Sequence, residues 1–219
     1  MQSAFREPFS GLSHLFAAFA AIAGLCILTV NATLHGDIWH ITSFAIFGSS
    51  MFLLFMASAI YHLLPVSEQA QKVWKRIDHM MIFVLIAGTY TPFCLVPLRD
   101  TVGWTLLAVI WGLAFTGILL KIFWIHAPRW LSTLIYIGMG WMILFAISPL
   151  SENLNDSALH WLIAGGLSYT GGAVIYATKW PNPYPQHFGF HEIWHLFVIG
   201  GAFCHFWAIA FHLITPISP

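Results

Sequence analysis

The sequence predicts an all-α membrane protein, a single domain over residues 1–219 in which seven helices span the bilayer. Hydrophobic residues make up 59% of the 219 positions and charged residues only 7%, whereas about 25% of the residues of a soluble domain are charged. The few charges also cluster, and they leave seven uncharged stretches. Each stretch is about as long as the roughly 20 residues that a helix needs to cross ~30 Å of hydrocarbon.

The expected helices are bounded by residues that interrupt helices. Pro65 follows the second span, Pro97 follows the third, and Pro128 precedes the fifth. A proline-rich segment at 181–185 separates the sixth span from the seventh, because proline cannot continue a helix. The predicted spans are residues 12–34, 39–64, 78–97, 103–124, 130–149, 157–178 and 191–214.

The basic residues predict the orientation of the bundle, because positively charged loops stay on the cytoplasmic side. Seven of the eight fall on the side of the N-terminus, three of them in the expected loop between the second and third spans, and only Arg99 falls on the other side. The seven are Arg6, Lys72, Lys75, Arg76, Lys121, Arg129 and Lys179. We therefore expect a multipass protein of the cell membrane with a cytoplasmic N-terminus and with Pro219 at an extracytoplasmic C-terminus.

Several other classes of protein are not supported by the sequence. The net charge is zero, and the chain has no long basic run or glycine-rich phosphate loop, so a nucleic-acid partner is not expected. The stretch 12–34 is too long for the apolar region of a signal peptide, and we expect it to be the first span. Cys26, Cys94 and Cys204 fall singly in different spans, which argues against a thiolate metal site or a disulfide framework.

Polar residues inside the expected spans indicate a metal site, because ionisable groups at membrane depth are costly and usually functional. The seventh span opens with HEIWH at 191–195, which places two imidazoles on nearly the same helix face. The second span ends with SAIYH at 58–62, and Asp78 opens the third span. Alternation of the spans brings these pieces together at the cytoplasmic end. Three histidines and a carboxylate fit a tetrahedral zinc site with an open fourth position, although copper, nickel and iron remain alternatives.

The remaining histidines receive other assignments. His14 and His79 are candidates for supporting the site, whereas His205 lies farther along the seventh span and is expected to be too deep to bind the same ion. Six others are expected to be interfacial or hydrogen-bonded, namely His35, His40, His126, His160, His187 and His212.

Nearly end to end, the sequence strongly resembles the hemolysin III family, the bacterial branch of the progestin and adipoQ receptor (PAQR) superfamily. The resemblance is carried by Glu-Pro at 7–8, Ser-His at 13–14, SAIYH at 58–62, Asp-His at 78–79, IAGTYTP at 86–92 and HEIWH at 191–195. It implies a seven-helix fold of the bacterial inner membrane, with zinc bound by His62, His191 and His195. It further implies that Asp78 holds the metal-bound water and that Ser58 lies beside the site.

The leading hypothesis for function is a ceramidase-like hydrolase that cleaves an amide or ester bond of a membrane lipid. Zinc would activate water, Asp78 would act as general base, and Ser58 would support Asp78 or the developing oxyanion. The alternatives are a non-enzymatic lipid sensor or receptor and a membrane-permeabilising haemolysin, which would be cytolytic. HEIWH also matches the HExxH pattern of metalloproteases, with Glu192 as the base. That reading ranks last, because Asp78 already supplies a carboxylate.

Overall fold

A computed structural model of the chain describes residues 5–124 and 128–214. The described residues are almost entirely helical, and their only β pairing is an isolated bridge between Tyr184 and Phe188. The elements are α1 (Pro8–His35), α2 (Ile38–Leu63), α3 (Glu68–Leu95), α4 (Thr101–Phe123), α5 (Arg129–Trp141), the 3-10 helix η1 (Met142–Ala146), α6 (Ile147–Asn153), α7 (Asp156–Thr178) and α8 (Phe190–His212). His126 and Pro219, which the sequence places at an interface and outside the cell, lie outside the described residues.

The helices form seven rods, because α5, η1 and α6 follow one another directly in the chain and together make one rod. In the described part of the chain, six rods are long and apolar enough to cross a membrane, and α7 is not among them. α7 has 23 residues, but glycines and hydroxyl side chains lower its hydropathy, and some of them serve packing against α8. Ser168, for example, donates a hydrogen bond from Oγ to the carbonyl oxygen of Phe197 at 2.8 Å. The predicted class, an all-helical membrane bundle, is confirmed at this level.

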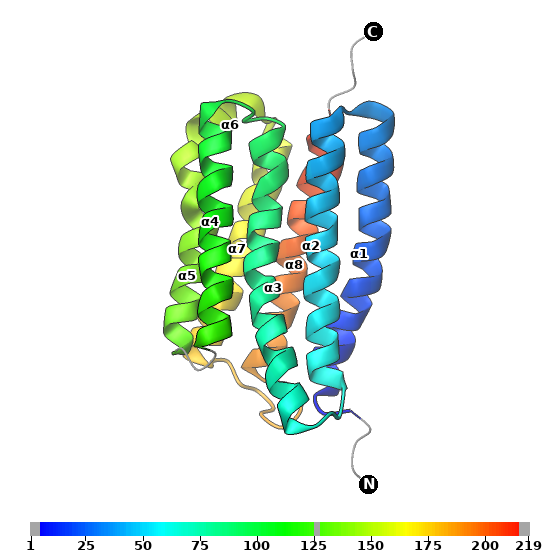
Figure 1. Ribbon diagram of the computed structural model, residues 1–219, viewed down its shortest axis with the longest axis vertical. Coiled ribbons are helices and arrows are strands. Elements are labelled where there is room, and N and C mark those ends of the chain that lie inside the picture. The colour runs from blue at the N-terminus through cyan, green and yellow to red at the C-terminus, as the bar shows by residue number, and fades with distance from the viewer. Residues whose placement is uncertain (1–4, 125–127, 215–219) are drawn as a thin grey trace.

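Neighbouring rods form a closed ring in the order α1, α2, α3, α4, α5, α7, α8, and α8 packs against α1 (Figure 1). The lower end of the bundle in this view is the end where α2 finishes and α8 begins, and the upper end is the one where α1 finishes and α2 begins. α1 starts at the lower end and α8 finishes at the upper end. Which end faces the cytoplasm stays a prediction.

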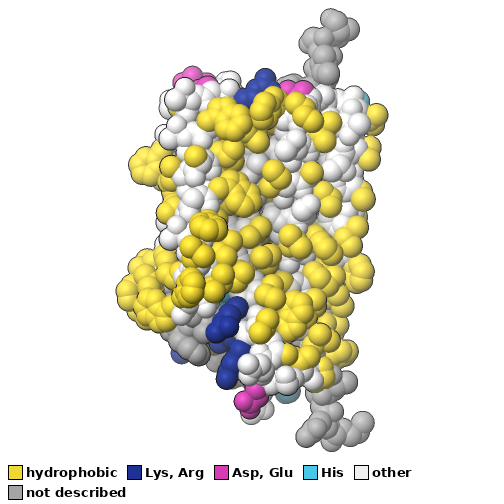
Figure 2. All heavy atoms as spheres, in the orientation of Figure 1, with side chains coloured by type: hydrophobic (Ala, Val, Ile, Leu, Met, Phe, Trp, Pro, Cys, Tyr) yellow, Lys and Arg dark blue, Asp and Glu magenta, His cyan; other side chains and the backbone are white. Residues whose placement is uncertain are grey.

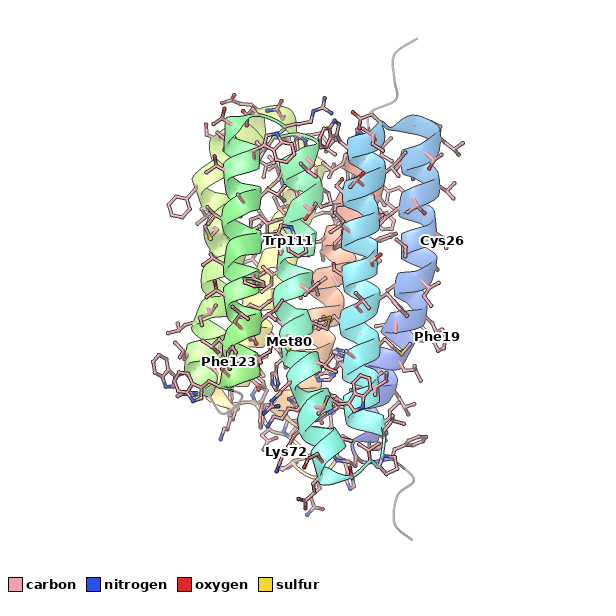
Figure 3. All side chains as sticks on the ribbon, viewed as in Figure 1. Phe19, Cys26, Lys72, Met80, Trp111 and Phe123 are labelled. Carbon is pink, nitrogen blue, oxygen red and sulfur yellow. The ribbon has the colours of Figure 1, made fainter. Side chains whose placement is uncertain are left out.

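The outer surface is that of a protein surrounded by lipid. Figure 2 shows hydrophobic side chains over the middle of the bundle, with charged side chains confined to its two ends. Phe123 and Phe145 are 84% and 86% exposed, and Figure 3 shows Phe123 pointing away from the bundle. Such exposure of large apolar side chains is unfavourable in water and is suited to a bilayer.

The start of the third helix differs from the prediction. α3 begins at Glu68 rather than at residue 78, and the Oγ of Ser67 caps it by accepting from the Ala70 N–H at 3.4 Å. The basic residues that were expected in a loop therefore lie on the first turns of α3, and Figure 3 shows Lys72 at the lower end of this helix. Hydropathy marked only the part that crosses lipid, whereas lysine, arginine and glutamine readily extend a helix into the polar region.

The fifth rod is also longer than predicted and contains a local break. Pro149 was expected to end it, but Pro149 lies in the first turn of α6, where the missing N–H is tolerated. The turn before α6 is instead the 3-10 segment η1. Tyr90 of α3 stabilises this break, because its hydroxyl lies 2.7 Å from the carbonyl oxygens of both Met139 and Gly140 and accepts from the Ile143 N–H at 2.9 Å. A side chain from a neighbouring helix thus satisfies backbone groups that the break frees.

Candidate metal centre

Three histidine side chains meet at the lower end of the bundle. His62 lies in the last turn of α2, and His191 and His195 lie on one face of the first turns of α8. One ring nitrogen from each lies within 4.8 Å of the others. His62 and His195 are buried, and His191 is partly buried. Helices that are far apart in the sequence therefore supply a compact group of possible metal ligands.

The spacing of these nitrogens suits a tetrahedral metal ion. Nε2 of His191 lies 3.5 Å from Nε2 of His62. Two imidazole nitrogens bound to one tetrahedral ion at about 2.0–2.1 Å are about 3.3–3.4 Å apart. The donor set, imidazole nitrogens without a thiolate, favours zinc and also suits copper, nickel or iron.

The opposite ring nitrogens are held by hydrogen bonds. Nδ1 of His62 lies 2.5 Å from Oε2 of Glu7, and Nδ1 of His195 lies 3.3 Å from the carbonyl oxygen of Ser10. Because a carboxylate and a carbonyl accept hydrogen bonds, these contacts place a proton on each Nδ1, and in the neutral rings each Nε2 then has the lone pair that a metal ion needs. Metal-binding histidines usually show this arrangement, in which an outer carboxylate or carbonyl orients the ring.

The segment before α1 is fixed against the end of α2. The N–H of Glu7 donates to the carbonyl oxygen of His62 at 3.1 Å, in addition to the contact between their side chains. The hydrogen bond from His62 lowers the pKa of the Glu7 carboxyl below its ordinary value, although partial burial acts in the opposite direction. Gly11 allows the close approach of the two helices, because a Cβ there would lie 2.4 Å from Cγ of Leu63. The N-terminal segment therefore belongs to the site.

Glu192, the acidic residue of the HEIWH motif, is already engaged by other groups. Its Oε1 accepts from the hydroxyl of Ser10 at 2.9 Å, and its Oε2 accepts from the N–H of Gly189 at 2.8 Å. Ser10 thus binds Glu192 with its side chain and His195 with its carbonyl. This arrangement caps α8 and joins it to α1, and it does not present Glu192 as a free base.

Two predicted catalytic residues and one supporting residue lie beside the histidine triad, which is the group of His62, His191 and His195. Asp78 of α3 lines the same cavity as His191 and His195 and is partly buried, and its carboxylate makes no hydrogen bond or ion pair with another described residue. Ser58 is buried one turn before His62, and its Oγ has no partner in the described part of the chain. His14 stacks on His195 with ring centroids 3.9 Å apart. Asp78 is not one of the grouped ligand residues, which agrees with a role other than direct ligation.

A cavity of about 420 Å³ opens beside the triad between α3, α5, α7 and α8. Its volume lies within the range of sites for small molecules. Above the histidines it is lined largely by apolar side chains, including Leu85, Phe93, Leu162 and Val198. The cavity thus joins a polar lower end to an apolar chamber at membrane depth.

The other histidines divide as follows. His79 points Nδ1 at the carbonyl oxygen of Lys75, 2.7 Å away, and lines the cavity without joining the triad. His205 is buried higher on α8, where its ring stacks on Tyr169 with centroids 5.5 Å apart, and it too stays outside the triad. His40 forms a capping interaction with Asp37 at the upper end.

Sequence reasoning missed the roles of Glu7, Ser10 and Lys121. The role of Glu7 could have been suspected from the sequence, because Glu7 is a carboxylate next to the first span on the side where the histidines meet. The role of the Ser10 backbone carbonyl could not, because no sequence feature marks it. Lys121 was counted only as a basic residue, yet it is 3% exposed and lines the cavity.

Comparisons with known proteins agree with the resemblance found in the sequence. The family described as "Haemolysin-III related" matches residues 2–206. The protein described as Hemolysin-3 of Bacillus cereus is 41% identical over 97% of this chain and 94% of its own length. The Hemolysin-3 homolog of Bacillus subtilis (strain 168) is 38% identical over 95% and 94% of the two chains. A monocyte to macrophage differentiation factor of Homo sapiens is 26% identical over 90% of this chain and 80% of its own length. This chain therefore belongs to the haemolysin III family of multipass membrane proteins.

Proposed function

We propose that the protein is a zinc-dependent hydrolase that cleaves an amide or ester bond of a membrane lipid. The observation that carries the proposal is the meeting of His62, His191 and His195 beside a cavity that also contains a carboxylate without a described partner. A structural zinc site normally has four protein ligands, whereas three ligands leave one position for chemistry.

The residues of this chain would divide the work as follows. His62, His191 and His195 would hold zinc, and zinc would supply a lowered pKa for water and polarisation of the scissile carbonyl. Asp78 would hold the attacking water by a hydrogen bond and accept its proton as the oxygen bonds to the carbonyl carbon. Ser58 Oγ would either orient Asp78 or donate to the developing oxyanion. The bond from carbon to nitrogen or oxygen then breaks, and Asp78 returns the proton to the leaving amine or alcohol.

The contacts of Glu192 separate this mechanism from that of a metalloprotease. Both of its carboxylate oxygens accept hydrogen bonds, one from Ser10 and one from the backbone of Gly189. A role in capping α8 accounts for it, and Asp78 remains the carboxylate that lines the cavity.

The test is lipid profiling of membranes incubated with purified wild-type protein, with Asp78→Asn and with Glu192→Gln. We expect Asp78→Asn to keep its zinc and to lose about 10²- to 10⁴-fold in turnover, because an amide cannot accept the proton. Glu192→Gln should turn over the same lipid at near the wild-type rate. Wild-type turnover by Asp78→Asn with full metal occupancy would remove Asp78 from the role of base, and loss of turnover in Glu192→Gln alone would favour the protease mechanism.

The alternatives make different predictions in the same experiment. A lipid sensor would leave every lipid intact and bind one of them in a zinc-dependent way. A pore, which the name Hemolysin-3 of the Bacillus relatives suggests, would give conductance in planar bilayers whether or not zinc is bound.

We also place the metal site at the cytoplasmic side of a bacterial inner membrane. The support is the distribution of basic residues and the similarity to bacterial Hemolysin-3 proteins. Single-cysteine labelling of intact cells should leave Lys72→Cys protected and Pro219→Cys accessible, and the reverse pattern would invert this orientation.

A further inference from the structure

Lys121, in the last turn of α4, is a buried cation in the wall of the cavity. Its side chain lines the cavity although the residue is only 3% exposed. Nζ donates a hydrogen bond to Oγ of Ser132, which is also buried, at 2.6 Å. An ammonium group has three N–H donors, so the serine hydroxyl satisfies one of them and neutralises none of the charge.

No negative group compensates this charge within the described part of the chain. None of its carboxylates lies within the ion-pair distance of 4.0 Å from Nζ of Lys121, since the ion pairs found there involve Arg6, His40, His62 and Arg99. A buried charge without a partner is strongly unfavourable. If Lys121 keeps its proton, this position favours an anion that is supplied from outside the chain.

The neighbourhood adds positive charge rather than neutralising it. Lys75 of α3 interacts electrostatically with Lys121. Both lysines line the cavity, where Asp78 is the only carboxylate among the described lining residues. Figure 2 shows Lys and Arg side chains between α3 and α4 near the lower end, below a mostly hydrophobic surface.

Two ordinary explanations for a lysine at this position do not account for its contacts. A lysine that snorkels to the membrane surface keeps its charged end in water, whereas Lys121 is almost fully covered. A lysine that caps a helix donates to the last carbonyl groups, whereas Nζ of Lys121 donates to a side-chain hydroxyl on α5. The ammonium instead joins α4 to α5 at the cavity, which both Lys121 and Ser132 line.

The other residues that line the cavity limit the kind of molecule that can carry the anionic group. The cavity continues from the lysines past Asp78 into an apolar chamber that includes Leu85 and Phe93. A small soluble anion would leave that chamber unused, while an acyl chain would fill it. Lys75 is exposed as well as lining the cavity, so the basic groups extend from the mouth inward.

We propose that Lys121 and Lys75 form a subsite for the oxyanion of an acyl-chain amphiphile, a phosphate or a carboxylate group whose chain lies in the apolar chamber. This inference deepens the proposed function by naming a class of lipid, and it rests on that proposal only for the statement that the bound lipid is a substrate. Lys75 precedes Asp78 by three residues and His79 by four on α3, so these side chains share one helix face. The anionic group would therefore bind beside the candidate base.

The test measures binding rather than turnover, in the Asp78→Asn background so that no ligand is hydrolysed. Purified protein in neutral detergent is titrated with oleoyl lysophosphatidate, oleate, uncharged monooleoylglycerol and inorganic phosphate, with native mass spectrometry and thermal unfolding as readouts. Lys121→Met removes the charge, and Lys121→Arg retains it. Lys72→Met is the matched control, because Lys72 lies on the lower end of α3 and does not line the cavity.

We expect Lys121→Met to weaken binding of the anionic amphiphile about 10- to 100-fold, the range for hydrogen bonds to a charged group. Its affinity for monooleoylglycerol should not change, and Lys121→Arg and Lys72→Met should bind like the parent. Without lipid, Lys121→Met should be at least as stable as the parent, because an apolar side chain replaces an uncompensated buried charge.

Three results would overturn the subsite. The first is an equal loss of affinity for charged and uncharged probes in Lys121→Met. The second is no loss of affinity in that variant, and the third is binding of inorganic phosphate as tight as that of lysophosphatidate. Whichever of lysophosphatidate and oleate binds more tightly shows whether the oxyanion is a phosphate or a carboxylate. If lipid profiling finds no turnover but this binding pattern appears, the hydrolase proposal fails and the subsite stands.

Discussion

The two ends of the bundle both gather polar side chains, but they differ in how completely those side chains are paired. At the upper end, Asp37 accepts hydrogen bonds from the N–H groups of Trp39 and His40, and Arg99 donates to its second oxygen at 2.8 Å. The side chains of Asp37 and Arg99 are 47% and 43% exposed. Although partial burial raises it, hydrogen bonds from His40 and Arg99 hold the pKa of the Asp37 carboxyl below its ordinary value.

The lower end buries polar groups and leaves several of them unpaired. Ser58 Oγ and both ring nitrogens of His14 have no hydrogen-bond partner among the described residues. Lys121 has a hydroxyl partner and no counter-charge in the same part of the chain. An unsatisfied buried polar group costs about 1–3 kcal/mol, so folding alone would not favour this arrangement. The upper end is thus stabilised by its own polar contacts, whereas the lower end leaves polar groups open to the ligands that we propose.

Among variants at the two ends of the bundle, we expect the largest effect at the lower end, where replacing His62, His191 or His195 with alanine should cause loss of the metal. Two remaining imidazoles form a poor site, and we expect metal affinity to fall by more than the about 10- to 100-fold seen when an outer residue is removed. Metal analysis of each purified variant by mass spectrometry measures this. Full zinc occupancy in all three single variants would reject the ligand set.

A smaller effect is expected from Glu7→Ala, because Glu7 orients His62 without being grouped with the ligands. Metal affinity should fall about 10- to 100-fold, and Glu7→Gln should fall less, because its amide oxygen still accepts from the ring N–H. Competition with a chelator of known affinity gives the values. Wild-type affinity in the alanine variant would show that the contact between Glu7 and His62 does not support the metal.

The smallest effect is expected at the upper end. Arg99→Gln removes the ion pair with Asp37, and because both side chains are well exposed the free energy of unfolding should change by less than about 1 kcal/mol. Metal content and lipid turnover should not change. Thermal unfolding in detergent, together with metal analysis, checks both statements. A loss of metal in this variant would mean that the two ends are coupled, contrary to the division drawn above.

Much of the fold could be predicted from the sequence, because the bilayer imposes length and hydropathy on each helix. Five predicted spans, the first, second, fourth, sixth and seventh, lie within a few residues of α1, α2, α4, α7 and α8. The start of the third helix and the break within the fifth rod could not be predicted. α3 extends to Glu68 through residues that are polar yet favour helices, and the break before Pro149 depends on a hydroxyl from Tyr90, 49 residues or more away along the chain. Such tertiary contacts leave no periodic trace in the sequence.

The candidate site was also predictable only in part. The spacing of His191 and His195, together with the alternation of helices, was sufficient to bring His62 near them. The contacts of Ser10 were not predictable, because neither its hydroxyl, which donates to Glu192, nor its backbone carbonyl, which binds His195, belongs to a motif. The burial of Lys121 was hidden as well, since a lysine near the end of an apolar stretch is ordinarily counted as an interfacial anchor.

The metal centre itself can be examined by X-ray absorption at the metal edge of the purified wild-type protein. We expect about one zinc ion per chain, bound by three imidazole nitrogens at about 2.0–2.1 Å and by one light oxygen ligand. His195→Ala, measured in parallel, should lose this signal. A folded wild-type protein that binds no metal, or a metal shell without imidazole, would show that the three histidines are not a metal site.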